Sequence, residues 1–127
     1  MTRLKTFLVE DCHTTRDHLA DTLEEQAHAR VIGWASTEAN AIQWLAKNKT
    51  AWDLAVLDLF LAEGSGLNVL KSLEKRPGQR VVVLSNYLTA SVRQRCLAMG
   101  ADGVFDKSTQ LDELVCFAAE MRQTAEA

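Results

Sequence analysis

Two hydrophobic patterns alternate along the chain. Short apolar runs are typical of strands buried on both faces, and longer stretches between them carry apolar residues at helical spacing. The predicted strands span residues 6–9, 30–35, 54–59, 81–84 and 103–105. The predicted apolar stripes of the helices are Leu19, Leu23 and Ala27; Ala39, Ile42 and Ala46; Leu67, Leu70 and Leu73; Val92, Cys96 and Met99; and Leu111, Leu114, Val115, Ala118 and Met121.

Local start and stop signals agree with this division. Thr37 is a good N-cap for the second helix, and Glu38 places a negative charge in its first turn. Gly100 follows the fourth helix as a C′ residue. Pro77 and Gly78 interrupt the chain between the third helix and the fourth strand.

Five strand–helix units in strict alternation predict an α/β fold. We expect a doubly wound (βα)5 structure, in which helices cover both faces of a parallel five-stranded sheet. Each crossover should be right-handed. For five units, the flavodoxin-like strand order 2-1-3-4-5 is a common solution. We expect residues 1–127 to form one domain.

Polar residues that can carry chemistry follow four of the predicted strands. Glu10 and Asp11 follow the first, Asp58 ends the third, Ser85 ends the fourth, and Lys107 follows the fifth. In a parallel sheet with this strand order, ligands bind beyond the carboxyl ends of the strands. We therefore expect three carboxylates, one hydroxyl and one lysine to converge at one edge of the sheet.

This set of groups favours a magnesium site and phosphoryl transfer. Three adjacent carboxylates repel one another, and Lys107 cancels only one of the charges. An anionic, oxygen-rich pocket without His or Cys suits Mg²⁺. An Asp oxygen can attack phosphorus while a metal, a lysine and a hydroxyl bind the phosphoryl oxygens. Each residue alone could be a helix cap or a polar turn, so the inference rests on their joint placement.

The sequence resembles the receiver domains of response regulators over essentially its whole length. The resemblance rests on the segments Phe7–Asp11, Leu57–Leu59, Gly64–Leu67, Val83–Ser85 and Gly100–Gly103, and on Lys107. It implies a stand-alone receiver with the fold of the chemotaxis regulators. The sequence is most similar in character to receivers that precede helix-turn-helix output domains.

The resemblance implies a role for each residue that matches the family pattern. Asp58 matches the phosphoacceptor, Ser85 the switch hydroxyl, and Lys107 the lysine that contacts the phosphoryl group. The implied Mg²⁺ ligands are Glu10, Asp11, Asp58 and the backbone carbonyl of Phe60.

The chain departs from the family pattern at three positions. Ser108 replaces the proline that usually follows the lysine; since a non-proline cis bond costs about 2.5–4 kcal/mol, we expect a trans or a strained peptide. Val104 stands where the family has its aromatic switch, and the adjacent Phe105 should point to the other face of the sheet. Ala62 occupies a position where proline is common.

The implied function is two-component signalling rather than classical enzymology. A sensor histidine kinase or a histidine phosphotransfer protein would donate the phosphoryl group. A downstream protein would bind the face formed by the fourth helix, fifth strand and fifth helix. We expect a monomer or a phosphorylation-dependent dimer.

Composition and charge exclude several other classes. The net charge is −3 without a basic cluster, which argues against nucleic-acid binding. No apolar run approaches the roughly 20 residues of a membrane span, and the start is not a signal peptide, so a cytoplasmic location is expected. Three cysteines without a Cys-x-x-Cys pair argue against disulfides and zinc.

Three other functions are disfavoured by particular residues. A haloacid-dehalogenase-type phosphatase needs a second Asp two residues after the first, where this chain has Phe60. A flavin or nucleotide carrier would open its first strand into a phosphate loop rather than Glu10 and Asp11. A receiver-like module that binds partners without phosphorylation would not need the acidic pair, Asp58 and Lys107.

Overall fold

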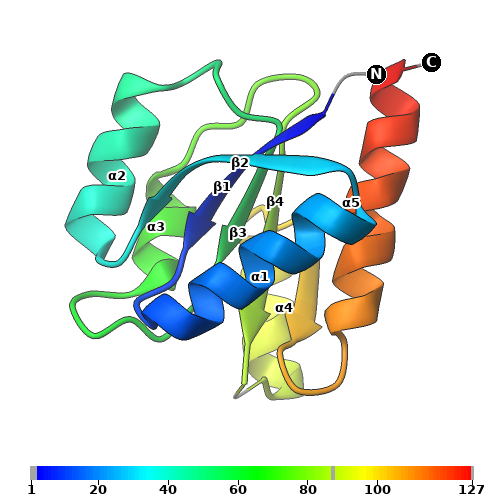
Figure 1. The fold of residues 1–127 in the computed structure, drawn as a ribbon. Coiled ribbons are helices and arrows are strands. Elements are labelled where there is room, and N and C mark those ends of the chain that lie inside the picture. Colours follow the sequence, from blue (N-terminus) through cyan, green and yellow to red (C-terminus); the bar gives the residue numbers. More distant parts are fainter. Residues whose placement is uncertain (1–2, 87, 127) are drawn as a thin grey trace.

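The elements alternate strictly, as the hydrophobic pattern predicts. The computed structural model describes residues 3–86 and 88–126, with side chains described as far as Met121. Its elements are β1 (Leu4–Val9), α1 (His13–Gln26), β2 (Ala29–Ala35), α2 (Glu38–Lys47), β3 (Leu54–Leu57), α3 (Gly66–Ser72), β4 (Arg80–Ser85), α4 (Ala90–Ala98), β5 (Gly103–Asp106) and α5 (Leu111–Glu126) (Figure 1).

The sheet confirms the predicted topology. Its five strands are parallel and lie in the order β2-β1-β3-β4-β5. Val9 is opposite Leu57, and Leu57 is opposite Val83, so β1, β3 and β4 end almost level with one another. The residues that follow these strands therefore leave the sheet side by side, along its lower edge in Figure 1.

Helices cover both faces of the sheet, which explains why its strands are apolar without alternation. The helices α1 and α5 pack on one face, and α2, α3 and α4 on the other (Figure 1). Successive residues of β1 serve opposite cores: Phe7 and Val9 pack on the side of α2, whereas Leu8 packs on the side of α1. The predicted stripes of α1 and α5 lie in the core on the side of α1.

The predicted apolar stripe of α2 is right for Ile42, which packs half-buried against the core, and wrong for Ala39 and Ala46. The buried side chains of this helix are Ala41 and Leu45, and the exposed ones include Ala39 and Ala46. The indole of Trp44 stacks flat on the ring of Phe7, with ring centroids 4.0 Å apart and an interplanar angle of 4°. This aromatic contact with β1 fixes which face of α2 is turned to the sheet, and helical spacing alone does not show it.

Two elements also end at different residues from those predicted. The strand β3 ends at Leu57, two residues earlier than predicted, and α3 ends at Ser72, because Leu73 is already extended. The caps are as predicted: the Thr37 side chain accepts a hydrogen bond from Asn40 N–H at 3.1 Å, and Gly100 has a φ of +104°. Within residues 3–86 and 88–126, no helix is long and apolar enough to cross a membrane.

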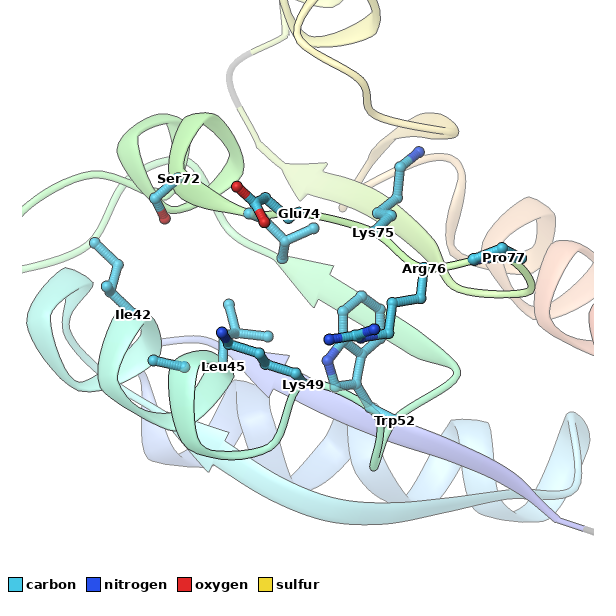
Figure 2. Close-up of a pocket in the computed structure, with 11 residues that line it drawn as sticks. Ile42, Leu45, Lys49, Trp52, Ser72, Glu74, Lys75, Arg76 and Pro77 are labelled. Carbon is cyan, nitrogen blue, oxygen red and sulfur yellow. The ribbon is translucent and has the colours of Figure 1, made fainter.

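A cavity of about 480 Å³ opens at the other end of the sheet (Figure 2). It lies between α2 and the segment that joins α3 to β4, with Trp52 beneath it and Lys49 and Arg76 at its rim. The buried Gln79 joins its walls, because it donates to Lys49 O and Trp52 O at 2.9 and 3.0 Å. The acidic residues that follow the strands do not line this cavity, so it is separate from the polar edge of the sheet.

Candidate functional site

The sheet itself places the acidic residues. Glu10 N–H donates to Ala35 O and Asp58 N–H donates to Val9 O, both at 3.0 Å, so the ladders continue one residue past β1 and β3. Glu10 and Asp58 are nearly buried, at 2% and 8% exposure, and Asp11 is half-buried. Their backbones are thus fixed before any ligand binds.

Glu10, Asp11 and Asp58 form a cluster suited to a metal ion. Each residue offers one carboxylate oxygen, and these oxygens all lie within 4.8 Å of one another. The donor set is entirely oxygen and carries three negative charges when ionised. Hard divalent cations prefer such ligands.

Lys107 supplies the positive charge of the cluster. Its Nζ donates to Asp58 Oδ2 at 2.8 Å and also to Glu10 Oε1. Its backbone N–H donates to Ser85 O at 3.0 Å, which holds the end of β5 against β4. Lys107 therefore reaches across β4 to the carboxylates that follow β1 and β3.

Burial and charge act in opposite directions on the protonation of this pair. Burial raises the pKa of Glu10; the hydrogen bond from Lys107 opposes this effect, and the nearby charge of Asp58 adds to it. Burial alone would lower the pKa of Lys107, but the hydrogen bonds to Asp58 and Glu10 outweigh it and raise that pKa. The lysine stays cationic, while the buried glutamate resists ionisation when no other cation is present.

The loop between β3 and α3 closes over the cluster. Phe60 N–H donates to Asp58 Oδ1 at 3.2 Å, and Ala62 N–H donates to Asp11 Oδ2 at 2.8 Å. Phe60 is 55% exposed. Gly66 allows this closure, since a Cβ there would lie 1.9 Å from Asp58 O. Asp58 therefore has a backbone donor on one oxygen and a cation on the other.

The two predicted switch residues are both buried. Ser85 is fully buried at the end of β4, and Val104 packs in the core beneath α4. Phe105 points to the opposite face, as predicted, where its ring meets Phe117 edge-on with centroids 5.9 Å apart. Tyr87, which lies in the connection after Ser85, is outside the described residues.

The segment after β5 has an ordinary backbone. The peptide bond between Lys107 and Ser108 is trans, one of the two outcomes expected in the absence of proline, and the described residues contain no cis peptide. Asp106 Oδ1 accepts hydrogen bonds from Ser108 N–H at 2.8 Å and from its hydroxyl at 2.6 Å. These bonds fix the turn that carries Lys107.

Arg16 is a residue of the site region that the sequence reasoning missed. Its side chain is buried, it donates to Glu10 O at 3.2 Å, and its guanidinium lies 3.7 Å from the ring centroid of the exposed Trp34. The sequence does contain a signal for this role, because Arg16 lies three residues before Leu19 on the buried stripe of α1. A charged residue on such a stripe needs a partner.

Comparison with known proteins establishes the family. The model of the response regulator receiver domain matches residues 6–118. The chain belongs to this family. It is a two-component receiver domain with an acidic pocket formed by Glu10, Asp11 and Asp58, a phosphoacceptor signalling module rather than a classical enzyme.

One curated protein resembles the chain in sequence, and two solved structures resemble it in fold. The transcriptional activator DevR/DosR of Mycobacterium tuberculosis is 30% identical over 112 residues, which cover 87% of this chain and 51% of the relative. A LuxR-family response regulator from Aurantimonas has a TM-score of 0.82 at 21% identity, over 96% of this chain and 87% of its own. The CheX–CheY–BeF3–Mg²⁺ complex from Borrelia burgdorferi has a TM-score of 0.80 at 17% identity, over 98% and 90%. The chain spans about half the length of the curated relatives it matches.

The raised pKa of Glu10 predicts how stability depends on pH. In the metal-free protein the folded state keeps a proton that the unfolded state loses. The melting temperature should therefore fall as pH rises from the ordinary pKa of a glutamate through the raised value. Millimolar Mg²⁺, which would bind only the folded, ionised pocket, should reverse the fall. Thermal melts across about pH 4–8 with and without Mg²⁺ measure this.

Glu10→Gln is the control for this effect. It removes the titrating carboxyl, so the fall with pH should flatten and the response to Mg²⁺ should shrink. A wild-type melting temperature that is indifferent to Mg²⁺ at every pH would contradict the prediction.

Proposed function

We propose that this receiver accepts a phosphoryl group on Asp58 in a Mg²⁺-dependent reaction. The donor would be a sensor histidine kinase or a histidine phosphotransfer protein, and phosphorylation would change the binding of a downstream protein. The observation that carries the proposal is the position of Asp58. It lies beside two further carboxylates and within 2.8 Å of the Lys107 ammonium.

The donor set fits Mg²⁺ better than a transition metal. The proposed ligands are the carboxylates of Glu10, Asp11 and Asp58, together with the backbone carbonyl of Phe60. All are hard oxygen donors, and the cluster contains no His or Cys. When bound, Mg²⁺ would neutralise negative charge on the carboxylates and the phosphoryl group. The B. burgdorferi complex, which has the same fold, contains Mg²⁺ and BeF3.

The chemistry proceeds by one displacement at phosphorus. A carboxylate oxygen of Asp58 forms a bond to phosphorus while the bond between phosphorus and the donor's imidazole nitrogen breaks, and the electron pair leaves with that nitrogen. The product is an aspartyl phosphate. Lys107 already donates to Asp58 Oδ2 and is placed to donate to an incoming phosphoryl oxygen. The hydroxyl of Ser85 would bind a second one.

Phe60 argues against the competing phosphatase function. A haloacid-dehalogenase-type enzyme uses a carboxylic acid two residues after the nucleophile to protonate the leaving group. Here that position holds an exposed phenyl ring, which has no proton to give. The remaining alternative is a receiver-like module that binds partners without phosphorylation, and a phosphorylation assay distinguishes it from a phosphoacceptor.

Incubation with acetyl phosphate and Mg²⁺ should add the mass of one phosphoryl group to the protein. Asp58→Asn should abolish the gain, because an amide oxygen is a poor nucleophile. Asp53→Asn is a matched control, since Asp53 precedes the same strand and its side-chain Oδ2 accepts a hydrogen bond from Lys5 N–H, away from the acidic cluster. Intact-mass spectrometry reads the result. An equal yield from Asp58→Asn would refute the assignment.

Phe60 should lengthen the life of the aspartyl phosphate. Its backbone N–H touches Asp58 Oδ1, so its side chain borders the path of a hydrolytic water that it cannot orient. We expect Phe60→Asn to dephosphorylate about tenfold faster, which corresponds to about 1.4 kcal/mol of activation free energy. Phe60→Leu, still apolar, should keep the wild-type rate. The decay of phosphoprotein after donor removal measures both, and equal decay for Asn and wild type would contradict the steric argument.

The proposed output face lies on β5 and α5, with α4 beside them. An apolar hollow of about 290 Å³ there is rimmed by acidic side chains and is lined by Phe105, Asp112, Glu113, Cys116, Phe117 and Glu120. Its charge favours a downstream protein that presents basic residues around an apolar one. Val104 is packed in the core and stiff at χ1, so it cannot rotate as an aromatic switch would. The signal would instead move through the connection after Ser85 and through α4.

Activation with beryllofluoride and Mg²⁺ should change amide chemical shifts along residues 86–106 as well as in the acidic pocket. The physical reason is that Ser85 must move toward the phosphoryl mimic and draw the following connection with it. A two-state shift of this kind needs a differential free energy of only a few kcal/mol. Asp58→Asn with the same salts is the control. Changes confined to the pocket would point to a phosphate relay without an output switch.

A further inference from the structure

A carboxylate outside the acidic cluster holds the loop that joins β3 to α3. Glu38, the first residue of α2, accepts hydrogen bonds at Oε1 from Ser65 N–H at 2.9 Å and from Asn68 Nδ2 at 3.0 Å. Its own N–H donates to Glu63 O at 3.1 Å. Glu38 therefore connects the start of α2 to both ends of the segment 63–68.

This loop carries the backbone groups that meet the acidic cluster. Phe60 and Ser65 face each other across an antiparallel bridge, so the residue held by Glu38 is paired with the residue whose carbonyl we propose as a metal ligand. Between them, Ala62 N–H donates to Asp11 Oδ2 at 2.8 Å. Displacement of Ser65 would therefore be felt at two of the proposed Mg²⁺ ligands.

Gly64 shows how closely the loop is pressed against Glu38. Its φ is +85°, and a Cβ built on it would lie 2.3 Å from Glu38 Cβ. Any side chain at position 64 would force the two segments apart and would also strain the backbone. The contact between Glu38 and the loop thus depends on the absence of a side chain at position 64.

The Glu38 carboxylate is suited to a fixed role of this kind. The hydrogen bond from Asn68, and then that from Ser65 N–H, lowers its pKa, so it is ionised at neutral pH. A charged acceptor makes shorter and stronger hydrogen bonds to N–H groups than a neutral one does. It contributes no ligand atom to the cluster of Glu10, Asp11 and Asp58.

We propose that Glu38 is a positioning residue for the Mg²⁺ site: through Ser65 it fixes the loop so that the Phe60 carbonyl and the ligand Asp11 are in place before the metal binds. The proposal rests on the function proposed above. Groups that orient metal ligands from outside the ligand set typically change metal affinity by 10–100-fold when removed. Glu38 acts on part of the ligand set, so the lower end of that range is expected.

The test compares Mg²⁺ affinity in matched carboxylate variants. Glu38→Ala should raise the Mg²⁺ dissociation constant about tenfold by calorimetry. The half-saturating Mg²⁺ for phosphorylation by acetyl phosphate should rise by the same factor, while the rate at saturating Mg²⁺ changes little. Glu38→Gln keeps an acceptor for both hydrogen bonds and should recover most of the affinity.

Glu24→Ala is the control for a merely structural effect. Glu24 also links a helix to a backbone amide, since its Oε2 accepts from Val31 N–H at 3.1 Å, but at the far end of the sheet. It should lower the melting temperature and leave the Mg²⁺ dissociation constant unchanged. Gly64→Ala disrupts the contact with Glu38 from the loop side and should weaken Mg²⁺ binding as Glu38→Ala does.

The outcomes separate this proposal from the proposed function. If Glu38→Ala and Gly64→Ala bind Mg²⁺ as tightly as wild type and Glu24→Ala, Glu38 has no positioning role. If Glu38→Ala does not fold, Gly64→Ala and Asn68→Ala, which removes only one hydrogen bond, decide the matter. A wild type that binds Mg²⁺ but takes no phosphoryl group would overturn the proposed function alone. A wild type without Mg²⁺ binding would overturn both.

Discussion

Repulsion among three carboxylates is the constraint on which the end of the sheet depends. Glu10 and Asp58 are both nearly buried, because β1 and β3 are neighbours that end level with each other. Lys107 is the counter-charge, and it can reach them only because β5 lies beyond β4 and its end is held to Ser85 O. The strand order thus decides the electrostatics: it assembles more negative charge than one lysine can offset.

The rest of the molecule is arranged so that this polar edge is supported by apolar packing. Helices on both faces bury every position of the central strand β3, which leaves its carboxyl end as the place where polar side chains can emerge. Loops carry the remaining groups, and the loop after β3 is held by hydrogen bonds to the cluster and to α2 as well as by the packing of Leu59 and Leu61 against the core. A rigid sheet and a tied loop together hold the acidic oxygens near one another.

The sequence was sufficient to predict the features that depend on spacing along the chain. Strand alternation gave the topology, and residues that follow strands gave the five side chains now found at one edge. Prediction from the sequence failed where contacts between residues distant along the chain determine the structure. The stacking of Trp44 on Phe7, 37 residues apart in the sequence, determines which face of α2 is turned to the sheet. The hydrogen bond from Ser65 to Glu38, 27 residues apart, holds the loop after β3. Neither partner can be identified from a period or a cap.

If the proposed function holds, the shared lysine would couple metal binding to phosphorylation. Lys107 now divides its hydrogen bonds between Asp58 and Glu10. If it moves to a phosphoryl oxygen on Asp58, the buried Glu10 loses part of its counter-charge, and its pKa, already raised by burial, rises further unless another cation compensates. A divalent ion on Glu10 and Asp11 would supply that charge. Each event then makes the other more favourable, and linkage requires the coupling to be equal in both directions.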